Sequence, residues 1–250
     1  MIEQHGDQGV RVLTLAQPQR GNALSEALVE ALIAAVETSC ADPTLHTLVI
    51  DAQGRHFCTG FDLGDAPQAS AEPQPDNAAD RDGPLLWRFA RIEQLLALLW
   101  HAPLRTVAIA QGRAWGAGAD LFAACDLRCA TPETQWRFPG AGFGIVLGTR
   151  RLAALVQEPQ AMAWVTQGQT IDGAQALASG LATALLPDAS DWRQHLPPLA
   201  VDRATYAQLK AATRPDHRDA DLAALVRSAA APGLRQRMAA YRERSRRPPP

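Results

Sequence analysis

The stretch Ala110–Arg128, AQGRAWGAGADLFAACDLR, decides both the fold and the chemistry of this chain. An apolar run ends in a Gln-Gly pair, and a glycine-rich turn at 116–118 then leads straight into a helix of small residues. A second stretch, Gly54–Leu63 (GRHFCTGFDL), also places glycine where an apolar run ends. Two such turns can bring backbone N–H groups that are distant in sequence onto one oxygen atom. The pattern predicts an oxyanion-binding site, in which one donor typically contributes about 2.7–4 kcal/mol to transition-state stabilisation.

Short apolar runs alternate with helical patterns in the first half of the chain. Val10–Ala16, Leu45–Asp51 and Arg105–Ala110 are rich in β-branched and aliphatic residues, which is typical of strands. Between the first two, apolar residues recur at helical spacing over residues 26–40, with Ser25 in place to cap that helix. This alternation predicts an α/β fold with parallel strands.

The segments after the second strand are less regular. Residues 65–84 are rich in Ala, Pro, Asp, Gln and Asn and lack apolar periodicity, which indicates either a functional lid or a disordered segment. A strongly apolar helix is predicted at Leu85–Trp100. Thr131 followed by Pro132 predicts another helix start, with threonine as the N-cap and proline at the first helical position.

The last third of the chain is predicted to be helical. Residues 149–185 show a helical pattern, in which Asp172-Gly173 opens one helix and Gly180 closes it. From about Pro187 a separate helical tail follows, and its last few residues are expected to fray.

Composition limits the partners of the 250-residue chain. The formal net charge is −2, so neither nucleic acid nor an anionic membrane surface is expected as a partner. No apolar run approaches the roughly 18 residues of a membrane span, and the first residues do not resemble a signal peptide, so we expect a cytoplasmic protein. The four cysteines are expected to be reduced core residues, because their spacing predicts neither a disulfide framework nor a metal site.

The glycine-rich turn begins like a dinucleotide-binding fingerprint. Its sixth position is Leu121 rather than glycine or alanine, and the N-terminal βαβ context is missing. We therefore expect no nicotinamide or flavin cofactor and no resident metal.

Four motifs, in this order and spacing, resemble the crotonase superfamily, the enoyl-CoA hydratase/isomerase family. They are VRVLTLAQPQRGNALSEAL, VIDAQGRHFCTGFDL, VAIAQGRAWGAGADLFAACDLRCA and IDGAQALASGLA. The resemblance implies a crotonase-like (ClpP-like) spiral of ββα units over residues 1–186 and a C-terminal helical trimerisation region over residues 187–250. It also implies an acyl-CoA thioester substrate, with coenzyme A present only as part of that substrate, and a homotrimer or a dimer of trimers.

The resemblance assigns roles to individual residues. The oxyanion donors would be the N–H groups of Phe61 and Ala117, the latter in the first helical turn, where unpaired amides and the helix dipole favour negative charge. Asp120 takes the place of one catalytic glutamate, although it could instead bond an adjacent loop. Trp136 and Phe138 would form either an aromatic wall for the acyl group or part of the core. The implied substrate-binding residues are Arg20, Ala23, Asp62, Leu63, Gly116, Trp136 and Gly140.

The chain departs from the family's two-glutamate hydratases at Gly140, where the second glutamate is missing. Hydration needs a base for water and a proton source for Cα, and one carboxylate does not easily supply both. Asp120 is also one methylene shorter than glutamate, and misplacing a catalytic group by about 1 Å can cost on the order of 10²-fold. The sequence therefore favours isomerisation or another single-base proton transfer over hydration.

Three alternatives stay open. The reaction of a decarboxylase or C–C lyase of the same family depends less on the missing glutamate. A non-catalytic acyl-CoA or acyl-carrier binding protein would use the oxyanion turns only to bind the thioester carbonyl. The 65–84 segment could also bring a different acid to the site.

Overall fold

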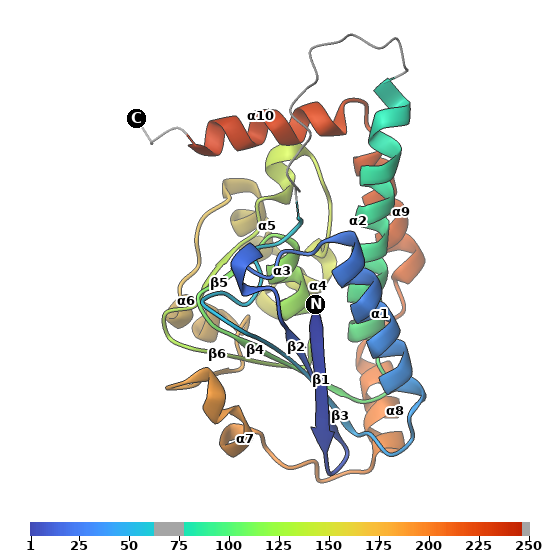
Figure 1. The fold of residues 1–250 in the computed structure, drawn as a ribbon, viewed down its shortest axis with the longest axis vertical. Coiled ribbons are helices and arrows are strands. Elements are labelled where there is room, and N and C mark those ends of the chain that lie inside the picture. Colours follow the sequence, from blue (N-terminus) through green and yellow to red (C-terminus); the bar gives the residue numbers. More distant parts are fainter. Residues whose placement is uncertain (63–77, 247–250) are drawn as a thin grey trace.

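The computed structural model describes residues 1–62 and 78–246 (Figure 1). Leu63 and most of the segment predicted to be a lid lie outside these residues. The part of that segment that is described, from Ala78 to Pro84, is helical, so the predicted start of the next helix at Leu85 is wrong. In the described part of the chain, no helix is both long and apolar enough to cross a membrane.

The centre of the molecule is a six-stranded sheet in the order β1-β2-β3-β4-β6-β8. Every neighbouring pair is parallel except β1 and β2, which form an antiparallel hairpin that the sequence did not predict. The predicted parallel α/β fold is therefore confirmed. The strands are β1 (Ile2–Asp7), β2 (Val10–Leu15), β3 (Thr47–Ala52), β4 (Arg105–Ala110), β6 (Leu127–Ala130) and β8 (Ala184–Leu185).

Alternation along these strands divides the core between the two faces of the sheet. Leu13 and Ile50 point into the large cluster beneath the helices α1 (Glu26–Ala41), α2 (Ala78–Trp100) and α3 (Ala117–Ala123), whereas Val12 and Val49 point to a smaller cluster closed by Trp192. Successive strand residues face opposite sides, so aliphatic residues at every position are expected for a sheet covered on both faces.

A second, two-stranded sheet carries the glycine-rich turn. It pairs β5 (Arg113–Trp115) in parallel with β7 (Gln135–Arg137). The helix predicted at Thr131-Pro132 is wrong. Thr134 N donates to Thr131 O at 3.0 Å to form a turn, and Gln135 N donates to Gly112 O at 2.7 Å. This long-range bond draws the chain into the second sheet before a helix can begin.

The helices follow the predicted capping signals. The Ser25 side chain accepts a hydrogen bond from Leu28 N at the start of α1, and Asp172 and Gln175 form a reciprocal capping box at the start of α6, which Gly180 ends in the left-handed region. The helices before the tail are α1 (Glu26–Ala41), α2 (Ala78–Trp100), α3 (Ala117–Ala123), α4 (Thr149–Val156), α5 (Glu158–Gln167) and α6 (Gly173–Ser179). Short 3₁₀ helices span Pro18–Arg20, Gly140–Phe143 and Ala189–Asp191.

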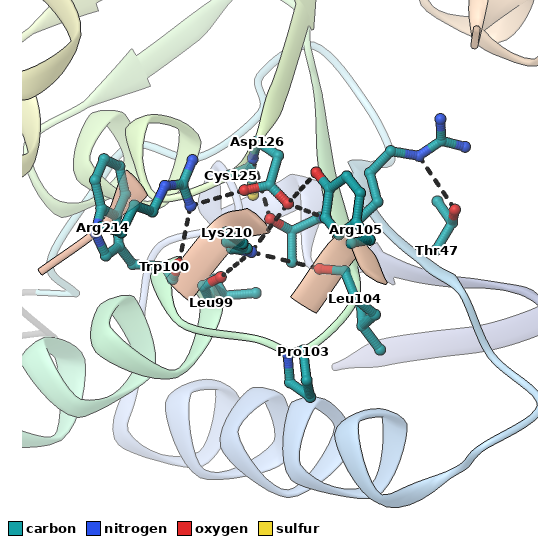
Figure 2. Close-up of polar contacts among 12 residues, drawn as sticks. Thr47, Leu99, Trp100, Pro103, Leu104, Arg105, Cys125, Asp126, Lys210 and Arg214 are labelled. Atoms are coloured by element: carbon teal, nitrogen blue, oxygen red, sulfur yellow. Dashed lines mark hydrogen bonds and ion pairs between the residues drawn. The ribbon is translucent and has the colours of Figure 1, made fainter. Parts of the chain in front are cut away.

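The C-terminal helices pack against the rest of the chain. Figure 1 shows α9 alongside α2, with α10 lying across one end of both. A cluster of buried apolar residues joins these helices, among them Phe89, Leu225, Leu234 and Met238. Figure 2 shows how α8 is held by ion pairs from Lys210 and Arg214 to Asp126. The four tail helices are α7 (Trp192–His195), α8 (Arg203–Thr213), α9 (Arg218–Ala229) and α10 (Leu234–Arg246).

The four cysteines are unpaired thiols, as the sequence predicted. Cys58, Cys125 and Cys129 are buried, and Cys40 is half-buried. Burial raises the pKa of Cys58 and of Cys125 to about 12, so both stay protonated and unreactive at neutral pH.

Candidate active site

The two glycine-rich turns lie against each other. Residues 58–60 run beside β5, with Cys58 N donating to Arg113 O and Trp115 N donating to Cys58 O. Gly60 has φ +95°, and a Cβ added there would lie 2.5 Å from Trp115 O and 3.5 Å from Ala117 N. Only glycine allows this approach, which brings the Gly60–Phe61 peptide next to the first turn of α3.

The backbone around Phe61 leaves its N–H available. Leu24 N donates to Gly60 O at 2.8 Å, and Asp62 N donates to Leu24 O at 3.2 Å. In this parallel pairing the Phe61 N–H faces away from Leu24. Within the described residues, no backbone hydrogen bond occupies the N–H of Phe61 or of Ala117. The Ala117 N–H is one of the amides that a helix start leaves without an intrahelical partner.

A cavity of about 270 Å³ opens at these amides. Phe61, Ala117, Asp120, Gly116 and Gly140 all line it, so the structure brings together five of the residues assigned by the resemblance. The rest of its wall is largely aromatic and aliphatic. It is made of Thr59, Gly60, Phe89, Trp115, Arg137, Phe138, Pro139, Ala141, Phe143, Ile145, Leu147, Thr149, Val165, Met238, Tyr241 and Arg242.

Asp120 lies one turn beyond Ala117 on α3 and is 7% exposed. Its carboxyl group presses against Gly148, the N-cap of α4, where an added Cβ would overlap Asp120 Oδ1. Burial raises the pKa of Asp120 well above its ordinary value, the charge of Arg151 opposes that rise, and the charge of Glu93 adds to it. A carboxyl group tuned in this way can hold or release a proton nearer neutral pH.

A buried ion-pair network lies near Asp120, and no local sequence pattern predicts it. Arg151 on α4 donates to Glu93 on α2, and both side chains are buried. Arg151 Nη1 also lies 3.3 Å from Asp221 Oδ2 on α9, and Arg150 Nε donates to Asp221 Oδ1 at 2.7 Å. Three helices, α2, α4 and α9, meet at this network. Glutamate and arginine are mostly surface residues, so a sequence pattern does not predict that they pair over a long range in the interior.

Gly140, which the family resemblance matched to the second glutamate of the hydratases, begins the 3₁₀ helix of residues 140–143. A Cβ added there would lie 3.3 Å from Ile145 O, so even a small side chain needs the following turn to shift. Among the described residues that line the cavity, Asp120 is the one carboxylate. No three His, Cys, Asp or Glu side chains of the described ranges converge on a metal-sized site.

Three of the other predicted substrate-binding residues lie beside the Phe61 turn. Arg20 donates to Asp62 at 2.9 Å, and Ala23 is buried just before the bridge between Leu24 and Phe61. The Asp62 carbonyl accepts a hydrogen bond from Arg88 Nη2 at 2.6 Å.

Trp136 is not part of the cavity wall. Its side chain is 0% exposed, and its ring lies 5.2 Å from that of Phe122 in the core. Trp136 therefore has the core role that the sequence analysis left open, whereas Phe138, two residues further on, lines the cavity. Alternation along β7 turns residue 136 inward.

The sequence missed most of the far wall of the cavity. Phe89 from α2 stacks on Phe61 with ring centroids 4.4 Å apart, and Phe143 lies 5.4 Å from Tyr241 of α10. Phe61 and Tyr241 are 180 positions apart in the sequence, and only tertiary packing brings α10 over the site.

A family comparison agrees with this geometry. The sequence profile of the enoyl-CoA hydratase/isomerase family matches residues 5–231. The chain belongs to the enoyl-CoA hydratase/isomerase family. Among curated relatives, the Mycobacterium leprae protein named "Probable enoyl-CoA hydratase echA6" is 33% identical over 208 residues, which is 79% of this chain and 78% of that protein. A zebrafish (Danio rerio) protein, enoyl-CoA hydratase domain-containing protein 3, mitochondrial, is 29% identical over 75% of this chain and 62% of its own length.

Solved structures place the same fold over the whole chain. A crystal structure of an enoyl-CoA hydratase/isomerase-type protein from Bordetella parapertussis is 38% identical, covers 99% of both chains and has a TM-score of 0.87. An enoyl-CoA hydratase-type structure from Mycobacterium avium paratuberculosis has a TM-score of 0.79 at 23% identity, which supports the fold alone. The resemblance to the crotonase superfamily is thus confirmed, and with it the membership of an enzyme family.

Proposed function

We propose that this enzyme moves a proton at the carbon next to an acyl-CoA thioester, through an enolate. One observation carries the proposal. The same cavity is lined by Phe61 and Ala117, whose amides are unoccupied, and by a single buried carboxylate, that of Asp120. This is the minimum set for one-base enolate chemistry.

The thioester oxygen would accept hydrogen bonds from the Phe61 and Ala117 N–H groups. Removal of a proton from Cα transfers negative charge to that oxygen, where the two donors and the start of α3 stabilise it. Asp120 takes the proton in its ionised form and returns it, at Cγ in an isomerisation, so the enzyme ends in its starting state. A base whose pKa is raised toward the working pH is suited to both steps.

The same geometry disfavours hydration. Water addition needs a second acid opposite Asp120, and the described wall has glycine at position 140. Decarboxylation or C–C cleavage, which also ends in an enolate, needs only the oxyanion donors and is the second candidate.

The remaining features of the proposal come from the family resemblance. Arg20, Ala23, Asp62 and Leu63 would line the coenzyme A arm, on the side of the cavity next to Phe61. Residues 1–186 would form the core domain and residues 187–250 the helical region that contacts other subunits in a homotrimer or a dimer of trimers. The protein would act in the cytoplasm and need no cofactor other than the coenzyme A of its substrate.

Hydrogen–deuterium exchange tests the proposal directly. The protein is incubated in D₂O with a panel of saturated and 3-enoyl-CoA thioesters, and Cα–H exchange is followed by NMR. We expect exchange in the wild type, a loss of at least about 10²-fold in Asp120→Asn, and no change in Asp219→Asn, an exposed aspartate of α9. Tight thioester binding without any exchange would overturn the proposal and identify a non-catalytic acyl-CoA-binding protein.

A further inference from the structure

The cavity carries positive charge that the proposed proton transfer does not use. Its ionisable wall residues are Arg137, Arg242, Tyr241 and Asp120, and the remaining lining is apolar or small. Burial raises the pKa of Asp120 and so favours its neutral form. Two arginines therefore line this space, with at most one carboxylate to balance them.

Arg137 lies next to the oxyanion turn. It pairs with Trp115 across the second sheet, and its carbonyl accepts a hydrogen bond from Gly116 N at 2.8 Å, one residue before the Ala117 donor. Its Nε donates to Gly168 O at 2.7 Å at the end of α5, which fixes the guanidinium plane. Neither terminal nitrogen of Arg137 forms a hydrogen bond or ion pair within the described residues.

Arg242 differs from its neighbours on α10. Arg237 donates to Phe143 O and Ala231 O, and Arg244 donates to Gly142 O, so both tie the helix to adjacent turns. Arg242 is half-buried and forms neither a hydrogen bond nor an ion pair with any described residue. The helix around it is held in place, because the Tyr241 ring packs on Phe143 and leaves no room for a Cβ at Gly142.

A half-buried guanidinium without a partner, beside aromatic rings, is the kind of group that binds a carboxylate strongly. Arginine presents a planar set of donors that match a carboxylate in two-point contacts, and such charge-assisted bonds are about twice as strong as neutral ones. A hydrophobic wall excludes water and strengthens the contact further.

We propose that this cavity selects acyl-CoA thioesters whose acyl group carries a carboxylate of its own, which Arg137 and Arg242 bind. The inference rests on the proposed function in one respect: the thioester carbonyl lies at the Phe61 and Ala117 amides. The coenzyme A phosphates are a second source of anionic oxygen. The whole pantetheine arm separates them from the thioester, whereas Arg137 is hydrogen-bonded through its backbone to the oxyanion turn itself.

Binding measurements test this selection. Succinyl-, glutaryl- and adipyl-CoA are compared with the same thioesters whose free carboxylate is replaced by a primary amide, which keeps size and removes charge. By titration calorimetry, we expect at least one chain length to bind about tenfold tighter as the carboxylate than as the amide. Arg242→Ala should bring that ratio close to one, and Arg242→Glu should invert it.

Two further variants complete the design. Arg137→Met keeps an unbranched apolar side chain without the guanidinium and should also lower the ratio, whereas Arg227→Ala removes an exposed arginine of α9 outside the cavity and should leave it unchanged. Thermal melting of each variant identifies any that do not fold, and Arg242→Ala, which loses no hydrogen bond or ion pair with a described residue, keeps the test decisive.

Pantetheine thioesters, which lack the nucleotide phosphates, separate the two sources of anion. A carboxylate preference that persists with them, and disappears in Arg242→Ala, supports the proposal. Equal binding of carboxylate and amide by the wild type overturns it, as does an equal loss of affinity for both in Arg242→Ala, which assigns Arg242 to a coenzyme A phosphate. Exchange without a carboxylate preference refutes only this inference, and a preference without exchange refutes only the proposed reaction.

Discussion

Asp120, within α3, and Asp126, three residues beyond the end of that helix, both have little-exposed side chains but opposite surroundings. Asp126 is enclosed by donors: Lys210 Nζ at 2.9 Å, Arg214 Nη1 at 2.7 Å, Tyr206 Oη at 3.1 Å and the Thr106 amide at 2.8 Å (Figure 2). The Asp120 side chain forms no hydrogen bond with a described residue and faces the cavity.

The difference in hydrogen-bond partners separates a structural buried carboxylate from one that is available for chemistry. The partners of Asp126 satisfy its carboxylate oxygens and join α8 to the sheet. A carboxyl group that lacks such partners is unfavourable for folding unless it keeps its proton, and it is then free to exchange that proton with a ligand. The absence of partners at Asp120 is thus the stronger sign of chemistry.

Replacing each aspartate by asparagine should separate the two roles most clearly. Asp120→Asn should lower the Cα–H exchange rate by about 10²–10⁴-fold, since the proton acceptor is lost while the fold is kept. Asp126→Asn should leave the exchange rate of the folded fraction within a few-fold of the wild type. A large loss of exchange in folded Asp126→Asn would contradict this division.

The stability of the same two variants should change in the opposite order. Asp126→Asn leaves the buried Lys210 and Arg214 uncompensated and should lower the free energy of unfolding by about 3–5 kcal/mol in urea titrations.

The folded protein holds the Asp120 proton more tightly than the unfolded chain, so its stability falls as pH rises from the ordinary aspartate pKa toward the raised one. Asp120→Asn should remove this fall. An Asp120 variant less stable than wild type at pH 7 would contradict it.

The oxyanion turn itself can be displaced without touching either aspartate. Gly60→Ala forces a Cβ to 2.5 Å from Trp115 O and should move the Phe61 amide, with a loss of about 2.7–4 kcal/mol in transition-state stabilisation. Gly83→Ala, at a helical glycine of α2 with open space around it, is the matched control for exchange rates. Unchanged exchange in folded Gly60→Ala would rule out the Phe61 amide as a donor.

The smallest effect is expected from the network near Asp120. The charge of Glu93 raises the pKa of Asp120, and that of Arg151 lowers it. Exchange needs ionised Asp120, so its rate should rise with pH through that pKa, and Glu93→Gln should move this rise to lower pH. A pH–rate profile that stays in place or moves upward would show that Glu93 does not act on Asp120.

The sequence predicted the parts of this molecule that depend on local rules. Parallel strands, the Ser25 and Asp172 caps and the Gly180 helix end all follow from composition and spacing. The resemblance then selected Phe61, Ala117 and Asp120, which the fold brings to one cavity. Thr131-Pro132 was misassigned because a turn and a helix start share the same residues, and only the bond from Gln135 to Gly112 decides between them. Arg137 and Arg242 were missed because nothing in the local sequence marks an arginine whose terminal nitrogens form no hydrogen bond.

The position of α10 over the cavity has a consequence for the order in which the enzyme becomes competent during synthesis. Met238, Tyr241 and Arg242 are translated more than a hundred residues after Ala117 and Asp120. A nascent chain can therefore complete its sheet and its oxyanion turn while one wall of the site is still missing. A ligand that contacts α10 binds only the docked form, and by mass action it would favour this last step of folding.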